Sequence, residues 1–193
     1  MKPLTLADIK DIAAYERVRN AFRNQIIELK TLRRVGIGDI ITLVFENRET
    51  ILFQVQEMMR AERIVEDAQI QYELDTYNPL LPDAFQLSAT LFIEIIDSQE
   101  LRRRLPTLLG LEEHLWLRAG NTRIQAQFEE GRSTAEKLST IHYVRFQLNS
   151  ELVVAFQQGI ESITLELDHP NYQFSTVLSE EIRAALALDL EDN

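Results

Sequence analysis

The chain has 193 residues, a length typical of one sizeable hydrophobic core and short for two. It contains no cysteine, which excludes disulfides, thiolate metal sites and cysteine nucleophiles. Its 31 Asp and Glu against 20 Lys and Arg give a formal net charge of −11, which disfavours nucleic-acid and anionic-membrane surfaces. We therefore expect a single domain over residues 1–193 with no nucleic-acid or membrane partner.

The first half of the chain is predicted to be mostly helical. Apolar residues recur every three or four positions over 5–34, which predicts a helix that ends at the glycines of 36–38. A helix of about 30 residues would be about 45 Å long, so we expect a kink, two helices, or a helix that reaches toward a partner. A buried strand is predicted at 39–46, and Asn47 is a good N-cap for a second helix over 48–77.

The second half is predicted to be rich in strands. In chain order, the pattern predicts a strand at 87–96, a short helix capped by Ser98, a hairpin over 114–130, a strand at 139–148, a helix at 150–158, a hairpin over 162–178 and a helix from 180. Strict alternation of strand and helix is absent, and several strands are joined by short turns. These features indicate an α+β fold, with long N-terminal helices packed on a largely antiparallel sheet and a strand-rich C-terminal half.

Basic side chains gather on one face of the first predicted helix. Their spacing is close to one or two helical turns, and the set comprises Arg19, Arg23, Lys30, Arg33 and Arg34. Guanidinium groups at this spacing could bind phosphates, nucleotides or the carboxylates of a partner protein. The alternative is that they pair with acidic residues of the second helix or face water.

The second predicted helix carries alternating acidic and basic residues at Glu57, Arg60, Glu62 and Arg63. Glu62 falls on the apolar stripe of this helix and is therefore expected to be buried. A buried carboxylate needs an arginine or a metal ion as its partner. No Glu-x-x-His motif occurs in the chain, so we expect a buried Glu–Arg network rather than a di-iron centre.

The three histidines are His114, His142 and His169, and each lies in or beside a predicted strand. Convergence on one face of a sheet, with Asp168 or Glu94, would suit zinc, iron or manganese. Their spacings match no local metal-binding motif. The alternative reading makes His169 a turn residue and His142 a core residue.

Several segments are more specific than the composition requires. They are FENRET (45–50), FQVQEMMRAERI (53–64), YNPLLP (77–82), LSATLFIE (87–94) and HYVRF (142–146). On these segments the chain resembles an uncharacterised bacterial family of about this length, catalogued as a domain of unknown function. The resemblance implies no activity, cofactor or catalytic residue.

Members of that family tend to be encoded beside a rubrerythrin-like protein and an iron–sulfur oxidoreductase that resembles heterodisulfide reductase subunits. The resemblance therefore implies an accessory role in a redox or oxidative-stress system, with one of these proteins as partner.

Two functional hypotheses remain open from the sequence. Neither a dinucleotide-binding or P-loop motif nor a nucleophile elbow occurs, so the sequence gives no support to those enzyme classes. The N-terminus has no signal-peptide pattern, and no apolar run approaches 18 residues, so a cytoplasmic location is expected. The first hypothesis is a cofactor-free accessory or interaction protein. The alternative is a metal-binding protein or metal-dependent enzyme that uses the histidines and the carboxylates of the second helix.

Overall fold

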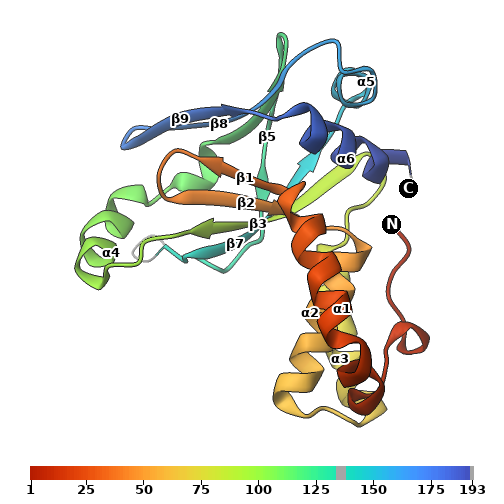
Figure 1. Ribbon diagram of the computed structural model, residues 1–193. Coiled ribbons are helices and arrows are strands. Elements are labelled where there is room, and N and C mark those ends of the chain that lie inside the picture. The colour runs from red at the N-terminus through yellow and green to blue at the C-terminus, as the bar shows by residue number, and fades with distance from the viewer. Residues whose placement is uncertain (134–137, 192–193) are drawn as a thin grey trace.

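The computed structural model describes residues 1–133 and 138–191, whose strands form two antiparallel sheets (Figure 1). The five-stranded sheet contains, in spatial order, β1 (Arg34–Ile37), β2 (Ile41–Phe45), β3 (Gln86–Ile93), β7 (Ile141–Gln147) and β6 (Gln127–Phe128). The four-stranded sheet contains β5 (Thr122–Gln125), β4 (Leu115–Ala119), β8 (Ile163–His169) and β9 (Tyr172–Val177). The predicted α+β class is confirmed, with two sheets in place of one.

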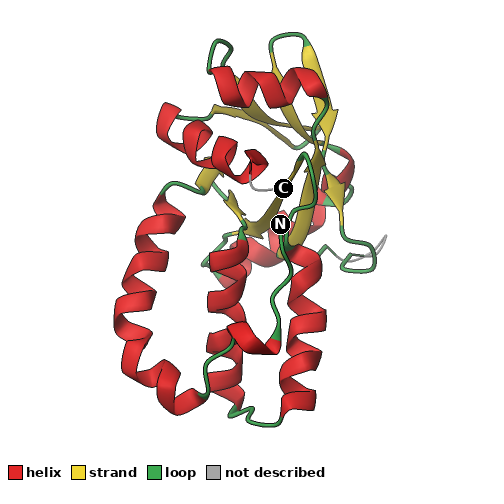
Figure 2. Ribbon diagram, turned by 90° about the vertical axis from the view of Figure 1, so that its right-hand side faces the viewer, coloured by secondary structure: helices red, strands yellow, loops and turns green. Residues whose placement is uncertain are grey.

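Five of the six helices in the described structure fall into two groups, and α4 belongs to neither. The six are α1 (Ile12–Thr31), α2 (Arg48–Glu62), α3 (Asp67–Tyr77), α4 (Ser98–Arg104), α5 (Ser150–Gln158) and α6 (Glu180–Glu191). The first three form a bundle that projects from the sheets, while α5 and α6 pack on each other at the sheet end of the molecule (Figure 2). None of the described helices is long and apolar enough to span a membrane.

The first helix is shorter than predicted at both ends. Thr5 caps a separate 3-10 turn, and α1 begins after Asp11, whose carboxylate accepts a hydrogen bond from the Ala14 amide. At the other end, α1 stops before strand β1, which the sequence analysis missed. This strand has only four residues and includes a glycine, so it carries little strand signal.

The second predicted helix is two helices. Helix α2 ends where Arg63 adopts a left-handed backbone conformation (φ 56°), and α3 begins only at residue 67. No glycine or proline marks this break, so the sequence offers no ordinary stop signal. The N-cap of α2 is Asn47, as predicted, but the N-cap of α4 is Asp97 rather than Ser98.

Two separate hydrophobic cores hold these parts together. The larger lies between the two sheets and under α5 and α6, where alternate residues of each strand point inward. On β7 the inward residues are His142, Val144 and Phe146, the face predicted from the alternation of the sequence. The smaller core fills the bundle around α2 and α3 and includes Leu4 from the N-terminal segment.

The outer face of the five-stranded sheet meets the root of the bundle. Strand register places Thr90 of β3 opposite Val44 of β2 and Tyr143 of β7. One step further along β3, Phe92 lies opposite Ile141 of β7. These five side chains share one face of the sheet because successive residues of a strand alternate between faces. They form the floor of a cavity between the sheet and the bundle.

Candidate functional site

A polar link joins α1 to α2 within the bundle. Arg19 donates two hydrogen bonds to the Glu57 carboxylate at 2.7 and 2.8 Å, and the Tyr15 hydroxyl donates a third at 2.7 Å. The hydrogen bond from Arg19 lowers the pKa of Glu57 below its usual value, against the opposing effect of burial. Burial raises the pKa of Tyr15. The group is thus a neutral phenol, a carboxylate and a guanidinium that fix the register of two helices.

The five basic residues singled out from the sequence lie in different environments. Arg19, Arg33 and Arg34 pair respectively with Glu57, Asp189 and Glu94, which belong to three different parts of the chain. Among the residues described, Arg23 and Lys30 make no ion pair. Arg23 is exposed, whereas Lys30 is half-buried and lines the cavity at the root of the bundle.

The four charged residues singled out between positions 57 and 63 do not share one network. Glu57 pairs with Arg19, and Arg60 pairs with Glu16 of α1 at 2.5 Å. Glu62 and Arg63 are exposed, so the expected burial of Glu62 is wrong. The physical reason is that α2 ends at Glu62, and the left-handed Arg63 turns the chain away before the apolar stripe continues.

The histidines divide between the two sheets. The rings of His114 and His169 lie edge to face, with centroids 5.1 Å apart, while His142 is buried in the five-stranded sheet. His142 bonds to the Ser139 carbonyl, and burial lowers its pKa below the usual value. Across residues 1–133 and 138–191, no group of three or more His, Asp or Glu could hold a metal ion.

His114 belongs to a surface network on the four-stranded sheet. Its Nδ1 lies 3.0 Å from Asp168, which also accepts hydrogen bonds from Trp116 and Arg123. Burial alone would raise the pKa of Asp168, but the hydrogen bonds from Arg123, His114 and Trp116 outweigh it and lower the pKa to about 2. The Asp168 carboxylate of β8 thus pairs with side chains of the other strands of this sheet, Trp116 of β4 and Arg123 of β5.

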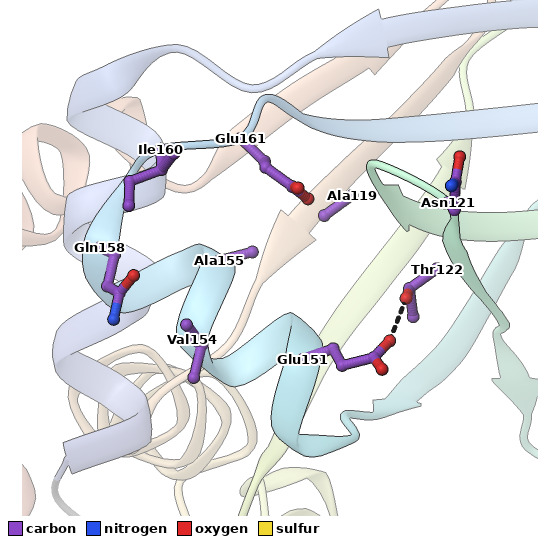
Figure 3. A pocket seen from close by; sticks show the side chains of 9 residues that line it. All are labelled: Ala119, Asn121, Thr122, Glu151, Val154, Ala155, Gln158, Ile160 and Glu161. Carbon is purple, nitrogen blue, oxygen red and sulfur yellow. Dashed lines mark hydrogen bonds between the residues drawn. The ribbon is translucent and has the colours of Figure 1, made fainter.

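An open cleft of about 390 Å³ lies between α5 and the turn that joins β4 to β5 (Figure 3). Two carboxylates, Glu151 and Glu161, line it, and the Thr122 hydroxyl donates to Glu151. Glu161 lies against Gly120, where an added Cβ would approach its carboxyl carbon to 3.0 Å. The remaining lining is amide and aliphatic.

The N-terminal segment (residues 1–10) is bound to the bundle by two amide side chains. Asn78 accepts from the Leu4 amide at 2.8 Å and donates to its carbonyl at 2.9 Å. Gln56 makes the same two-way contact with Lys10, at 2.9 and 3.0 Å. This segment thereby forms one wall of two surface hollows on the bundle.

We call one of these hollows the bundle groove. It has a volume of about 340 Å³ and is lined by Asp8, Lys10, Tyr15, Val18, Ala21, Phe22, Gln25, Leu52 and Gln56. Its floor is largely apolar, and Val18 is 40% exposed. Arg17 and Arg23, on the same helix, are exposed and make no ion pair within the described part of the chain. The groove is therefore an apolar surface on a helix that also displays free positive charge.

A second hollow, the junction pocket, lies between the bundle and the five-stranded sheet and measures about 170 Å³. Its lining comprises Lys30, Val44, Glu46, Ile51, Gln54, Tyr77, Leu80, Thr90, Phe92, Ile141 and Tyr143. All three bundle helices or their ends contribute to it. Glu46 is buried there and accepts hydrogen bonds from the hydroxyls of Thr50 at 2.5 Å and Thr90 at 2.6 Å.

Sequence reasoning missed the junction pocket, although part of its signal is present. Glu46 lies between an apolar strand and the Asn47 cap, so a charged residue stands at the point where the strand passes into the helix. The alternation along β7 also places Tyr143 on the face opposite His142. What the sequence lacks is the pairing of β3 with β2 on one side and with β7 on the other, which brings Thr90 and Tyr143 beside Glu46.

Fold and surface together define an α+β protein of two antiparallel sheets with a projecting three-helix bundle. The chain belongs to the family described as "Protein of unknown function (DUF3501)", which it matches over residues 3–190. It is similar to a crystal structure described as a novel protein of unknown function from Burkholderia pseudomallei K96243. The two are 35% identical with a TM-score of 0.92, over 98% of this chain and 100% of the other. No curated protein matches the chain in sequence.

Proposed function

We propose that this protein is a cofactor-free accessory protein of the bacterial cytoplasm that binds a redox partner through the bundle groove. The observation that carries the proposal is the apolar groove beside α1, a helix on which Arg17 and Arg23 are exposed and form no ion pair with the residues described. An apolar centre with cationic neighbours suits a partner surface that is apolar in the middle and acidic at its edge.

The partner we propose is the iron–sulfur oxidoreductase or the rubrerythrin-like protein that the family resemblance implies. Two features of the groove support a protein occupant over a small molecule. It is shallow enough that Val18 remains 40% exposed, and it continues onto the exposed side chains of a helix of 20 residues. Helix faces of this kind are common recognition elements in protein complexes.

The test uses both candidate partners, purified with their clusters or metal ions, in equilibrium titrations with this protein. Val18→Glu should weaken binding at least about tenfold, because a carboxylate would be desolvated in the apolar centre of the interface. Val154→Glu is the matched control, since Val154 is 44% exposed but lies on α5 in the other part of the molecule.

The positive charge is tested separately. Arg23→Glu should weaken binding chiefly by slowing association, and the difference from the parent protein should shrink as salt is added. Equal binding by the parent, Val18→Glu and Val154→Glu would show that the groove is not the interface. Failure of both partners to bind would contradict the proposed function.

The proposal that the protein holds no metal cofactor is tested by measuring its metal content. Elemental analysis of untagged protein from its native host, prepared without chelators, should find no stoichiometric iron, zinc or manganese. A stoichiometric metal that is lost in His114→Gln, His142→Gln or His169→Gln would instead establish the metal-binding alternative.

A further inference from the structure

The junction pocket holds a buried charge that no residue of opposite sign contacts within 1–133 and 138–191. Among the Asp, Glu, Lys and Arg side chains that the structure describes, three are buried: Arg33, Glu46 and Asp189. Arg33 and Asp189 form a bidentate pair with each other. Glu46 has two threonine hydroxyls as donors and no cation among its described neighbours. Since burying an unpaired carboxylate is costly, the site keeps Glu46 at the expense of stability.

The carboxylate also has unused hydrogen-bonding capacity. Two carboxylate oxygens provide about four lone-pair positions, and the hydroxyls of Thr50 and Thr90 occupy one on each oxygen. Thr50 is itself fixed, because its hydroxyl accepts from the Asn47 amide at the start of α2. Glu46 is thus held by the helix cap and by strand β3, with room for further donors from the pocket.

A positive charge lines the same pocket from the other side of the junction. Lys30, near the end of α1, is half-buried there and makes no ion pair or hydrogen bond with its ammonium group in the described structure. It lies farther from Glu46 than ion-pair distance, since no such pair forms between them. The pocket therefore has a negative and a positive group, and neither forms an ion pair with any residue that the structure describes.

The rest of the lining suits a small molecule with a short hydrocarbon part. The rings of Tyr77, Phe92 and Tyr143 line the pocket, and aromatic faces attract an ammonium group. Val44, Ile51, Leu80 and Ile141 supply aliphatic surface. The volume of about 170 Å³ is close to the ~150 Å³ of an engineered cavity that holds benzene.

We propose that the junction pocket binds a small zwitterion of the α-amino-acid class, with its ammonium group at Glu46 and its carboxylate at Lys30. The Gln54 amide, also in the lining, supplies a donor for the carboxylate. This inference goes beyond the docking role proposed above and does not depend on it, because the two sites share no lining residue.

Other ligand classes leave one of the two charges unmatched. A divalent metal ion would find a single carboxylate and an ammonium group that repels it. A phosphate or simple carboxylate would be bound by Lys30 but repelled by Glu46. A simple amine would match Glu46 and would leave Lys30 beside another cation. A zwitterion matches both charges at once, which is the complementarity expected of a specific site.

The first experiment compares one ligand with the two molecules made by removing each of its charges. The probes are L-alanine, L-valine and L-leucine, and for valine its matched pair isobutylamine, which lacks the carboxylate, and 3-methylbutanoate, which lacks the ammonium group. Titration calorimetry on the full chain should show binding of at least one amino acid. Each single-charge analogue of valine should bind about tenfold more weakly or worse, because it leaves a protein charge unpaired.

The second experiment removes the charges from the protein. Glu46→Gln and Lys30→Met should each weaken amino-acid binding about tenfold or more, and should reduce its preference over the corresponding analogue. The matched controls are Glu62→Gln on α2 and Lys2→Met in the N-terminal segment, both of which are exposed and lie outside the pocket. Circular dichroism of every variant shows whether it is folded at the titration temperature.

The outcomes separate the proposal from its competitors. Binding of isobutylamine as tight as that of valine, unaffected by Lys30→Met, would overturn the proposal in favour of an amine site. Absence of binding by all three amino acids at millimolar concentration would also overturn it. If Glu46→Gln does not fold, the Lys30→Met variant and the charge-deleted ligands still decide the question. Loss of partner binding with intact amino-acid binding would contradict only the docking proposal.

Discussion

The bundle and the two-sheet body are stabilised in different ways. The bundle core is built almost entirely from residues 51–81, which are close together in the sequence, with Leu4 added from the N-terminal segment. The core of the sheets joins β1 to β8 and β9, more than a hundred residues apart, and is closed by α6. Elements with few long-range contacts open at lower free energy than those with many. We therefore expect the bundle to open locally while the sheets set the free energy of global unfolding.

The largest expected effect comes from the buried ion pair that ties α6 to the start of β1. Arg33→Ala leaves Asp189 buried without its guanidinium partner, which should lower the free energy of unfolding by about 3–5 kcal/mol. Chemical denaturation followed by the fluorescence of Trp116, the single tryptophan, measures this change in the sheets. The double variant Arg33→Met/Asp189→Leu should recover most of the loss. Equal instability of both variants would show that altered packing, not the broken ion pair with Arg33, is responsible.

The second-largest expected loss of stability is at the turn between β1 and β2, where the two sheets meet. Gly38 has φ +71°, and an added Cβ would lie 2.7 Å from the Phe174 ring and closer still to the Tyr172 hydroxyl. Gly38→Ala should therefore cost at least about 2 kcal/mol of global stability, from the left-handed backbone and the steric overlap. Gly36→Ala is the control, because nothing lies within 4 Å of its added Cβ. The same denaturation assay should find at most a small change there; similar losses in both variants would contradict the explanation.

The free energy of unfolding should also depend on pH through a histidine of the five-stranded sheet, His142. Burial lowers the pKa of His142, so the unfolded chain takes up a proton at higher pH than the folded chain does. Stability from this residue is complete above pH about 6.5 and falls below it, by at most about 1.4 kcal/mol per pH unit. His142→Gln should lose less stability than the parent between pH 7.5 and 5.5 in urea denaturation. An unchanged pH slope would exclude His142 as the source.

The smallest expected loss of stability comes from a substitution in the bundle, and it should be restricted to the bundle. Glu57→Gln removes the charge that pairs with Arg19 and should cost about 1 kcal/mol, because the pair is partly exposed. Hydrogen exchange should accelerate in α1 and α2 while β3 and β7 keep their protection. Glu62→Gln, exposed on the same helix, is the control. Accelerated exchange throughout the sheets would show that the bundle and the sheets unfold as one unit.

The same contrast explains what could be predicted from the sequence. Local signals placed the Asn47 cap, the strand alternation around His142 and the α+β class correctly. The break at Arg63 was missed because the left-handed backbone that ends the helix belongs to an arginine, where a glycine would have given the usual stop signal.

The junction pocket was missed for a related reason. Glu46, Thr90 and Tyr143 are far apart in the sequence, and only the pairing of three strands brings them together. The charged residues chosen from helical spacing, such as Arg19 and Glu57, proved to contact each other because two helices pack side by side. Spacing along a helix identifies a face, but it does not identify the element that covers that face.

The two amides that bind the N-terminal segment have one more consequence. Asn78 and Gln56 each accept a hydrogen bond from the N–H and donate one to the C=O of a single backbone residue. A neighbouring β-strand would make the same pair of hydrogen bonds with its backbone, so here two side chains replace strand pairing. An acid of the same shape cannot do this, because a carboxylate has no hydrogen to give and would face the carbonyl of Leu4 or Lys10 with a like partial charge. Replacement of both amides by acids, Asn78→Asp with Gln56→Glu, would therefore release the start of the chain from the bundle.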